Sequence, residues 1–507
     1  MSLKIIRKEI EAEREVGHRY LQMLSRAETL VPGAGREAIE VLLWDANAAI
    51  IRADVQNDRV VLDGTLNCQA VYRQGEENAL RALSAKTTLS QVVELPGAQG
   101  GMLARVLPVV ENVEARYENG HMVFLASLGL FVRVMKLEPV EYISDIEDAT
   151  EIQTRYRTFD LTRLAAEATE TAVLTERVEL PQALDARAVL MDWGSVSVES
   201  SEPDLGGVRV RGKVMVEALI ASGLEGRPAV LVKYPIVFDK LLELPEWLSR
   251  DACVTPTVRS VRTQLEAPED EEEGALMLQA DVHFSIAANL TEEIRALEDA
   301  YGTGGTQVEV EAQQLRLCAE AVCIRMQETV RGTVLIEDGA PAVGSVIAVR
   351  VQPNIAEMVP DGTRTRISGL MEATVLYMPG GSDRPTSART QLPFEFELPR
   401  ALDDAPAVRL NVVTTEANAL MSDRLEMKVG LCVDCEARLQ QEVTVVRDLK
   451  EGEDAPRRPG YVICWPEAGD DAWSIGRRYG ISEESVEESA PEGGMRMGQP
   501  MILRITG

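Results

Sequence analysis

The residue types that most often carry catalysis are few and scattered in this chain. Its three histidines are His18, His121 and His283. We expect them in an N-terminal helix, at a hairpin turn and on the polar face of a strand. No serine or cysteine lies in a recognisable nucleophile motif, and the sequence has no glycine-rich phosphate loop. The sequence therefore predicts a protein that is not an enzyme and uses no cofactor.

Two cysteines have a spacing that is also found in redox and zinc sites, Cys432 and Cys435. In a regular strand, residues three apart point to opposite faces and lie about 10 Å apart, which is too far for a disulfide. A second CxxC pair that would complete a zinc site is absent. We therefore expect buried or edge thiols and no metal site. The seven cysteines follow no disulfide framework, which is typical of a reducing compartment.

Composition limits the class of protein further. A chain of 507 residues predicts three or four domains, and 45% apolar residues with only 4% aromatic ones predict aliphatic cores. The formal charge of −30 argues against broad contact with nucleic acid or anionic lipid. The longest apolar stretch, 123–132, is too short to span a membrane, and the N-terminus lacks a signal-peptide core. We expect a cytosolic protein.

A pattern recurs at intervals of about 150 residues. Gly64, Gly212 and Gly369 each lie in a strand-like run and precede the proline of a Glu-Leu-Pro sequence by 30 to 33 residues. A second anchor is the recurrence of Glu147-Asp148-Ala149 as Glu298-Asp299-Ala300. A repeat of this length predicts a duplicated domain rather than a solenoid unit.

Each copy shows the period of two that is typical of half-buried strands, as in 208–218, 276–286 and 425–433. Asn119-Gly120 predicts a tight hairpin turn, and the acidic run Glu269–Glu273 predicts a solvated loop. The fold class is therefore mainly β, with three tandem domains of antiparallel sheets or sandwiches.

The predicted organisation begins with a helix, because Ile6, Ile10, Leu21 and Leu24 lie at helical spacings. The predicted segments are an N-terminal helix at 1–27, repeats at 28–160, 161–315 and 316–450, a linker at 451–458 and a module at 459–507.

The C-terminal module differs from the repeats in its pattern. A short strand, Tyr461–Cys464, precedes a helix that Asp470 or its neighbour is expected to cap, and Gly480 is expected to close that helix. A second short helix and a strand at Met501–Ile505 follow, so the expected order is βααβ. We expect Trp473 and Tyr479 to be core residues.

This module resembles a LysM domain. The matching residues are Gly469, Asp470, Asp471, Ala472, Trp473, Ile475, Gly476, Tyr479, Ala490-Pro491, Gly498, Gln499 and Met501. The resemblance implies a ligand site on the loops 467–472 and 490–497, and the candidate ligand-binding residues are Gly469, Asp470, Asp471, Ala472, Pro491, Gly493, Gly494 and Met495. The usual threonine is Asp471, the usual asparagine is Ala490, and the module is acidic. These departures favour a protein ligand over N-acetylglucosamine chains.

The repeats resemble the SPOCS domain through the glycine, a Val-Leu-Tyr strand, the Glu-Leu-Pro sequence and Asp299-Ala300-Tyr301. With the LysM-like module, the chain is similar to SipL-type spore coat morphogenetic proteins of endospore-forming Firmicutes. The resemblance implies a scaffold in the mother-cell cytoplasm, at the forespore surface, that tethers coat proteins including a coat-basement ATPase. The alternative is a wall or cortex protein that binds peptidoglycan.

Overall fold

The computed structural model describes residues 4–33, 38–75, 79–147, 150–245, 248, 252–266, 274–337, 339–402, 406–453, 460–491 and 494–505. Antiparallel β structure dominates this part of the chain, so the expected fold class, mainly β, is confirmed. Within the described residues, no helix is both long enough and apolar enough to cross a bilayer. The candidate loop Glu269–Glu273 lies outside the described residues.

One arrangement of six strands occurs three times along the chain. In each repeat, the first, sixth and fifth strands form one sheet, here called the arm sheet, and the second, third and fourth form another, here called the meander sheet. The strands of the first repeat are β1 (Lys4–Leu30), β2 (Ile39–Gln56), β3 (Arg59–Gln74), β4 (Leu80–Glu94), β5 (Leu103–Glu118) and β6 (His121–Glu147).

The second repeat contains β7 (Ile152–Glu179), β8 (Ala186–Asp204), β9 (Gly207–Leu224), β10 (Arg227–Glu243), β11 (Ala252–Glu266) and β12 (Ala275–Gly302), with a 3₁₀ turn, η1 (Gln182–Leu184), before β8. The third repeat contains β13 (Val308–Leu335), β14 (Val343–Asp361), β15 (Arg364–Pro379), β16 (Thr386–Leu398), β17 (Ala407–Met421) and β18 (Arg424–Glu451). Alternating apolar side chains of the two sheets in each repeat form that repeat's own core, as in a β-sandwich.

The structure explains why glycine occurs at the same position in each repeat. Gly64, Gly212 and Gly369 each lie opposite a β-bulge in the preceding strand, where the register shifts by one residue. A Cβ at Gly64 would come within 2.5 Å of the carbonyl oxygen of Ala49, and a Cβ at the other two positions would overlap the corresponding carbonyl oxygens. Only glycine fits where the backbones approach this closely.

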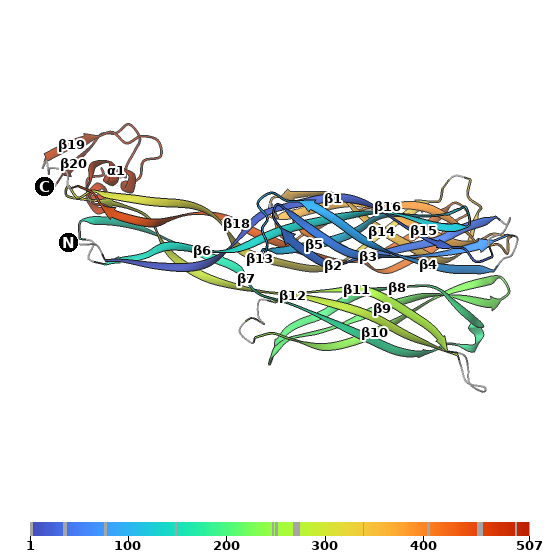
Figure 1. The fold of residues 1–507 in the computed structure, drawn as a ribbon. Coiled ribbons are helices and arrows are strands. Elements are labelled where there is room, and N and C mark those ends of the chain that lie inside the picture. The colour runs from blue at the N-terminus through green and yellow to red at the C-terminus, as the bar shows by residue number, and fades with distance from the viewer. Residues whose placement is uncertain are drawn as a thin grey trace.

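The three repeats share two further cores, which place them around a common axis. The ends of the long first and sixth strands, here called the arms, pack together through apolar residues of all three repeats. The three meander sheets pack together through Leu43, Met191 and Ala348, which occupy the same position in each repeat. Figure 1 shows the arms converging toward the end of the molecule that carries both termini.

The predicted N-terminal helix at 1–27 is wrong. Residues Lys4–Leu30 form β1, which pairs along its whole length with β6, more than ninety positions later in the chain. His18 therefore lies on a strand. The expected boundary at 160/161 falls within β7, and that at 315/316 falls within β13. Bulges also align Asp299 with Asp145, rather than with Asp148 as the sequence anchor suggested.

The C-terminal module has the predicted βααβ order. It contains β19 (Gly460–Cys464), α1 (Ala472–Tyr479), α2 (Glu483–Glu488) and β20 (Met501–Ile505), with β19 antiparallel to β20. Asp471 is the N-cap of α1 and forms a capping box with Ser474, while Gly480 closes the helix in the left-handed conformation. A small core that includes Ile475, Val486 and Leu503 joins the helices to the sheet.

Candidate functional site in the C-terminal module

The two predicted ligand loops lie side by side. The backbone N–H of Gly498 donates to the carbonyl of Pro466 at 3.1 Å, which joins the segment after β19 to the segment before β20. Gly469 and Gly494 adopt positive φ angles of 93° and 84° and shape the turns of these loops. Gly493 lies outside the described residues.

The remaining predicted ligand residues have structural contacts of their own. Ala472 is buried in the core of the module, and Met495 packs against that core. The carbonyl of Pro491 accepts a hydrogen bond from the N–H of Gly494 at 3.0 Å. These contacts engage the predicted ligand residues within the module, while Arg496 and Met497 are the exposed side chains of the second loop.

Asp470 and Asp471 stabilise the start of α1. Asp470 accepts from the backbone N–H of Glu467 at 2.9 Å and pairs with Arg478 at 2.8 Å, and these contacts lower the pKa of Asp470. The backbone N–H of Ser474, which donates to Asp471 at 2.8 Å, is the main cause that lowers the pKa of Asp471. Both residues therefore act as carboxylates that fix the loop and the helix.

The outer face of the β19–β20 sheet carries an unusual density of exposed apolar side chains. Tyr461, Ile463 and Trp465 alternate along one face and are 75%, 62% and 59% exposed. Ile502 pairs with Ile463 across the sheet and is 61% exposed. We call these four residues the apolar face. A contiguous apolar surface of this kind in a strongly charged chain is typical of an interaction site.

The opposite side of the module docks on the arm of the second repeat. Trp473 Nε1 donates to Asp299 Oδ2 at 2.9 Å, and Arg477 pairs with the same oxygen at 2.7 Å. The Tyr301 ring packs edge-to-face on Trp473 at 4.7 Å, and its hydroxyl donates to the carbonyl of Ile481 at 3.0 Å. Trp473 and Tyr301 are only 5% and 4% exposed, so this contact is dry.

A cation completes the docking contact. The Arg155 guanidinium lies over the Trp473 ring at 4.6 Å, pairs with Asp471 at 3.0 Å and lies 3.7 Å from Glu483. Gly476 permits the close approach, because a Cβ there would overlap the Tyr301 hydroxyl. The contact therefore uses ring packing, a guanidinium over a ring and charged hydrogen bonds together.

Carboxylates at the same bulge serve as contacts in all three arms. Asp145 accepts from Tyr156 at 2.9 Å, and Asp448 pairs with Arg7 at 2.5 Å, so each joins its arm to the neighbouring repeat. Asp299 alone receives the module. Sequence reasoning identified Asp299-Ala300-Tyr301 as part of a pattern but missed its docking role, because nothing in linear spacing relates these residues to Trp473.

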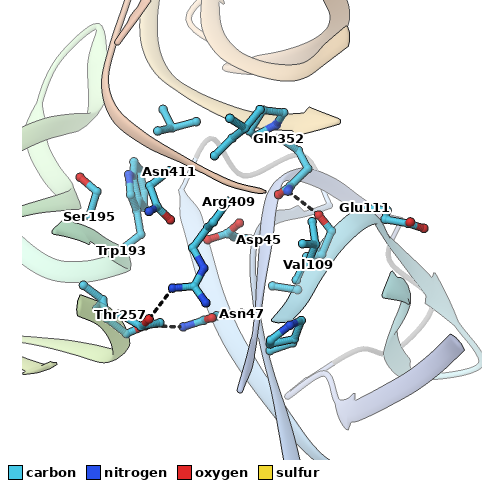
Figure 2. Close-up of a pocket in the computed structure, with 18 of the residues that line it drawn as sticks. Asp45, Asn47, Val109, Glu111, Trp193, Ser195, Thr257, Gln352, Arg409 and Asn411 are labelled. Carbon is cyan, nitrogen blue, oxygen red and sulfur yellow. Dashed lines mark hydrogen bonds between the residues drawn. The ribbon is translucent and has the colours of Figure 1, made fainter. Parts of the chain in front are cut away.

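A cavity of about 1370 Å³ lies where the repeats meet (Figure 2). Its wall is formed mainly by the second and fifth strands of each repeat. Asp45, Trp193 and Arg350 occupy one equivalent position in the three repeats and contact one another there. Arg350 pairs with Asp45 at 2.7 Å and lies over the Trp193 ring at 4.6 Å.

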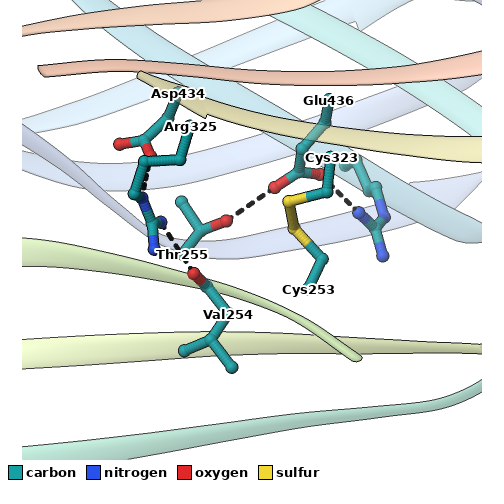
Figure 3. Close-up of a disulfide and its surroundings, with 8 residues drawn as sticks. Cys253, Val254, Thr255, Cys323, Arg325, Asp434 and Glu436 are labelled. Atoms are coloured by element: carbon teal, nitrogen blue, oxygen red, sulfur yellow. Dashed lines mark hydrogen bonds and ion pairs between the residues drawn. A yellow bond between two sulfur atoms is a disulfide. The ribbon is translucent and has the colours of Figure 1, made fainter. Parts of the chain in front are cut away.

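The structure contains one disulfide, Cys253–Cys323, between β11 and β13, which the sequence interpretation did not foresee (Figure 3). Ion pairs flank it: Arg325 pairs with Asp434 at 2.6 Å and donates to the carbonyl of Val254 at 2.8 Å. The other five cysteines, Cys432 and Cys435 among them, are free and buried, as expected for that pair.

The described residues hold no group of three or more histidine, cysteine, aspartate or glutamate side chains placed to bind a metal ion. His121 begins β6 directly after the Asn119-Gly120 turn, as predicted. His283 lies on β12 near the Thr171 hydroxyl at 3.3 Å, and burial lowers its pKa.

Comparison with known proteins adds one finding. No curated protein and no solved structure matches the chain. A family described as "SipL, SPOCS domain" matches residues 37–118, which span β2 to β5 of the first repeat. Over that region, the chain is similar to a SPOCS domain of the SipL type.

Proposed function

We propose that this chain is a non-enzymatic scaffold in the assembly of the bacterial endospore envelope. Its three repeats are SPOCS-type domains, and its C-terminal module is a LysM-like domain that binds a protein. The partner is a spore coat morphogenetic protein such as a coat-basement ATPase, and the site of action is the forespore surface facing the mother-cell cytoplasm.

The family match supports the sporulation role. It covers β2 to β5, and the strand order of that region recurs as β8 to β11 and β14 to β17. The glycine and the bulge opposite it recur at the same place in each copy. Equal strand order with equal bulges supports extension of the SPOCS assignment to the second and third repeats.

The docking of the module supports the scaffold role, and this is the observation that carries the proposal. Trp473 and Asp299 hold α1 on the arm, while the apolar face of the β19–β20 sheet remains exposed. Arg504 pairs with Tyr461 across the sheet and is exposed, and it forms no ion pair within the part of the chain that the structure describes. The module therefore presents an apolar surface with positive charge, which suits a partner with an apolar and acidic surface.

The experiment measures binding of the full-length chain to the purified coat-basement ATPase by biolayer interferometry. Ile502→Glu places a charge in the apolar face and is expected to weaken binding at least tenfold. The matched control is Leu205→Glu, because Leu205 is 79% exposed in a hairpin of the second repeat. Equal binding by wild type and Ile502→Glu would refute the assignment of the apolar face.

A second assay addresses peptidoglycan. Ala490 stands where LysM domains usually have asparagine, and the predicted loop residues are engaged within the module. We therefore expect no saturable retention of the full-length chain on purified peptidoglycan. Saturable retention that is lost on substitution in the loops 467–472 and 490–497 would favour a wall or cortex protein instead.

A further inference from the structure

The central cavity contains a cation without a counter-ion of its own. The Arg409 side chain, on β17, projects into the cavity and donates to the Thr257 hydroxyl at 2.8 Å (Figure 2). Burial by the surrounding protein lowers the pKa of Arg409. It forms no ion pair with any residue that the structure describes, although taking a guanidinium out of water is costly unless an anion compensates.

The nearby carboxylates are already engaged with other groups. Asp45 pairs with Arg350 at 2.7 Å, and Asp434 pairs with Arg325 at 2.6 Å. Glu436 is bound on both oxygens, because Arg105 pairs with one at 2.7 Å and the Thr255 hydroxyl donates to the other at 2.7 Å. Asp434 and Glu436 favour the charged form of Arg409 only through space. None of these carboxylates therefore neutralises the Arg409 charge through an ion pair.

Neutral polar groups without protein partners lie around the same space. Trp193 Nε1 and the Ser195 hydroxyl line the cavity, and neither has a hydrogen bond to another described residue. Asn354 also lines the cavity, and its side-chain oxygen is buried without a hydrogen-bond partner. In Figure 2, Trp193 and Ser195 lie on the same side of the Arg409 side chain, and Trp193 is the nearer of the two in this view.

The arrangement is specific to this point in an otherwise repeated wall. The position of Arg409 is occupied by Leu107 in the first repeat and by Thr255 in the second, as the bulges of the fifth strands align them. Of these three residues, Arg409 and Leu107 line the cavity, whereas the Thr255 hydroxyl donates to Glu436, so only the third repeat brings a charge to the cavity from this position. Packing of three equivalent repeats does not require different residues at this position, whereas a binding site for an asymmetric molecule does.

We propose that the central cavity binds a small organic molecule carrying an oxyanion, either a carboxylate or a phosphate. Arg409 binds the oxyanion through its planar donors, and Trp193 and Ser195 contribute hydrogen bonds or packing to the rest of the molecule. The volume of about 1370 Å³ exceeds that of most small-molecule pockets, so a metabolite fits together with bridging water. This site is independent of the proposed protein docking at the module.

The test uses the full-length chain with two probes, inorganic phosphate and citrate, in isothermal titration calorimetry and thermal unfolding. We expect one probe or both to bind, and Arg409→Gln to weaken that binding about 10- to 100-fold. The matched control is Arg366→Gln, an exposed arginine on β15 away from the cavity. Arg409→Lys retains the charge but loses the planar donors, so it is expected to fall between wild type and Arg409→Gln.

The outcomes separate the sources of the oxyanion. Binding of phosphate alone identifies a phosphate ester, and binding of citrate alone identifies a carboxylic acid. Without ligand, Arg409→Gln is expected to raise the melting temperature, because it removes a partly buried charge that pairs with no described carboxylate. Failure of both probes to bind wild type at about 10 mM, or equal binding by wild type and Arg409→Gln, would overturn the proposal.

Discussion

Trp473 Nε1 lies 2.9 Å from Asp299 Oδ2, and this hydrogen bond joins the C-terminal module to the arm of the second repeat. The aspartate belongs to a bulge that recurs in every arm. Its counterparts Asp145 and Asp448 join repeat to repeat, through Tyr156 and Arg7. The module therefore uses a contact position that the repeats otherwise use to bind one another.

Loss of the indole N–H should loosen the module. Trp473→Phe keeps an aromatic ring, although a smaller one, and removes the donor, and hydrogen bonds to charged groups contribute about 1.5–3 kcal/mol. Because Arg477 still pairs with Asp299, we expect the docking contact to weaken by about 1–2 kcal/mol. The α1 amides should then exchange roughly 5- to 30-fold faster. Hydrogen exchange with mass spectrometry over residues 472–482 measures this change in exchange rate. Asp448→Asn serves as control, and an equal effect there would contradict a specific docking contact.

Acid should weaken the same contact. The pKa of Asp471 is lowered below its ordinary value of 3.8, first by the N–H of Ser474 and also by Arg155. Because the folded pKa is lowered, the stabilisation is present above pH 3.8 and is lost as the pH falls through the folded pKa. Asp471→Asn keeps a good N-cap but cannot titrate. Exchange of α1 amides, corrected for intrinsic rates between pH 6 and pH 3, should rise more in wild type than in this variant.

Sequence reasoning succeeded where the signal is local and failed where it depends on distant pairing. The period of two predicted strands such as β9 and β12, and Asp471 with Gly480 marked the ends of α1. The N-terminal segment was mistaken for a helix because apolar residues four apart, Ile6 and Ile10, satisfy both helical and strand periods. Only the partner strand β6 decides between them.

The candidate sites show the same division. The two loops of the module were placed from sequence because LysM-like residues surround them. The docking of Trp473 on Asp299 and the cavity around Arg409 were not, because each requires repeats far apart in the chain to assemble. A pattern such as Asp299-Ala300-Tyr301 marks an unusual position, and its contact is set by tertiary packing alone.

The repeated glycine should not tolerate a side chain. At Gly369 a Cβ would overlap the Asn354 carbonyl and also approach the Phe394 ring at 2.6 Å. We expect Gly369→Ala to lower the free energy of unfolding by about 1–3 kcal/mol. Gly380 has open space around its Cβ position and no positive φ, so Gly380→Ala should be neutral or stabilise by up to about 1 kcal/mol. Urea denaturation compares the two, and equal effects would refute the steric argument.

The five free cysteines should react slowly with thiol reagents in the native chain, and the other two cysteines form the disulfide. Burial raises the pKa of Cys68 and of Cys435 to about 12, and that of Cys432 to about 11, so their thiolate populations at pH 8 are small. We expect no rapid reaction of the oxidised native chain with Ellman's reagent and five thiols after denaturation. A thiol reductant should attack the exposed Cys323 sulfur and form a mixed disulfide with it, which releases Cys253 as the first free thiol, and a second reductant thiol then releases Cys323.

The disulfide itself should stabilise the contact between the second and third repeats. It joins residues 70 apart in sequence, and closing a loop of this length is worth about 2–4 kcal/mol. Cys253→Ser with Cys323→Ser should lower stability by that amount, while wild type with reductant should behave like the double variant. Cys68→Ser alters a buried thiol in the first repeat and tests whether any cysteine loss has the same effect. A reductant effect that persists in the double variant would show that another group is responsible.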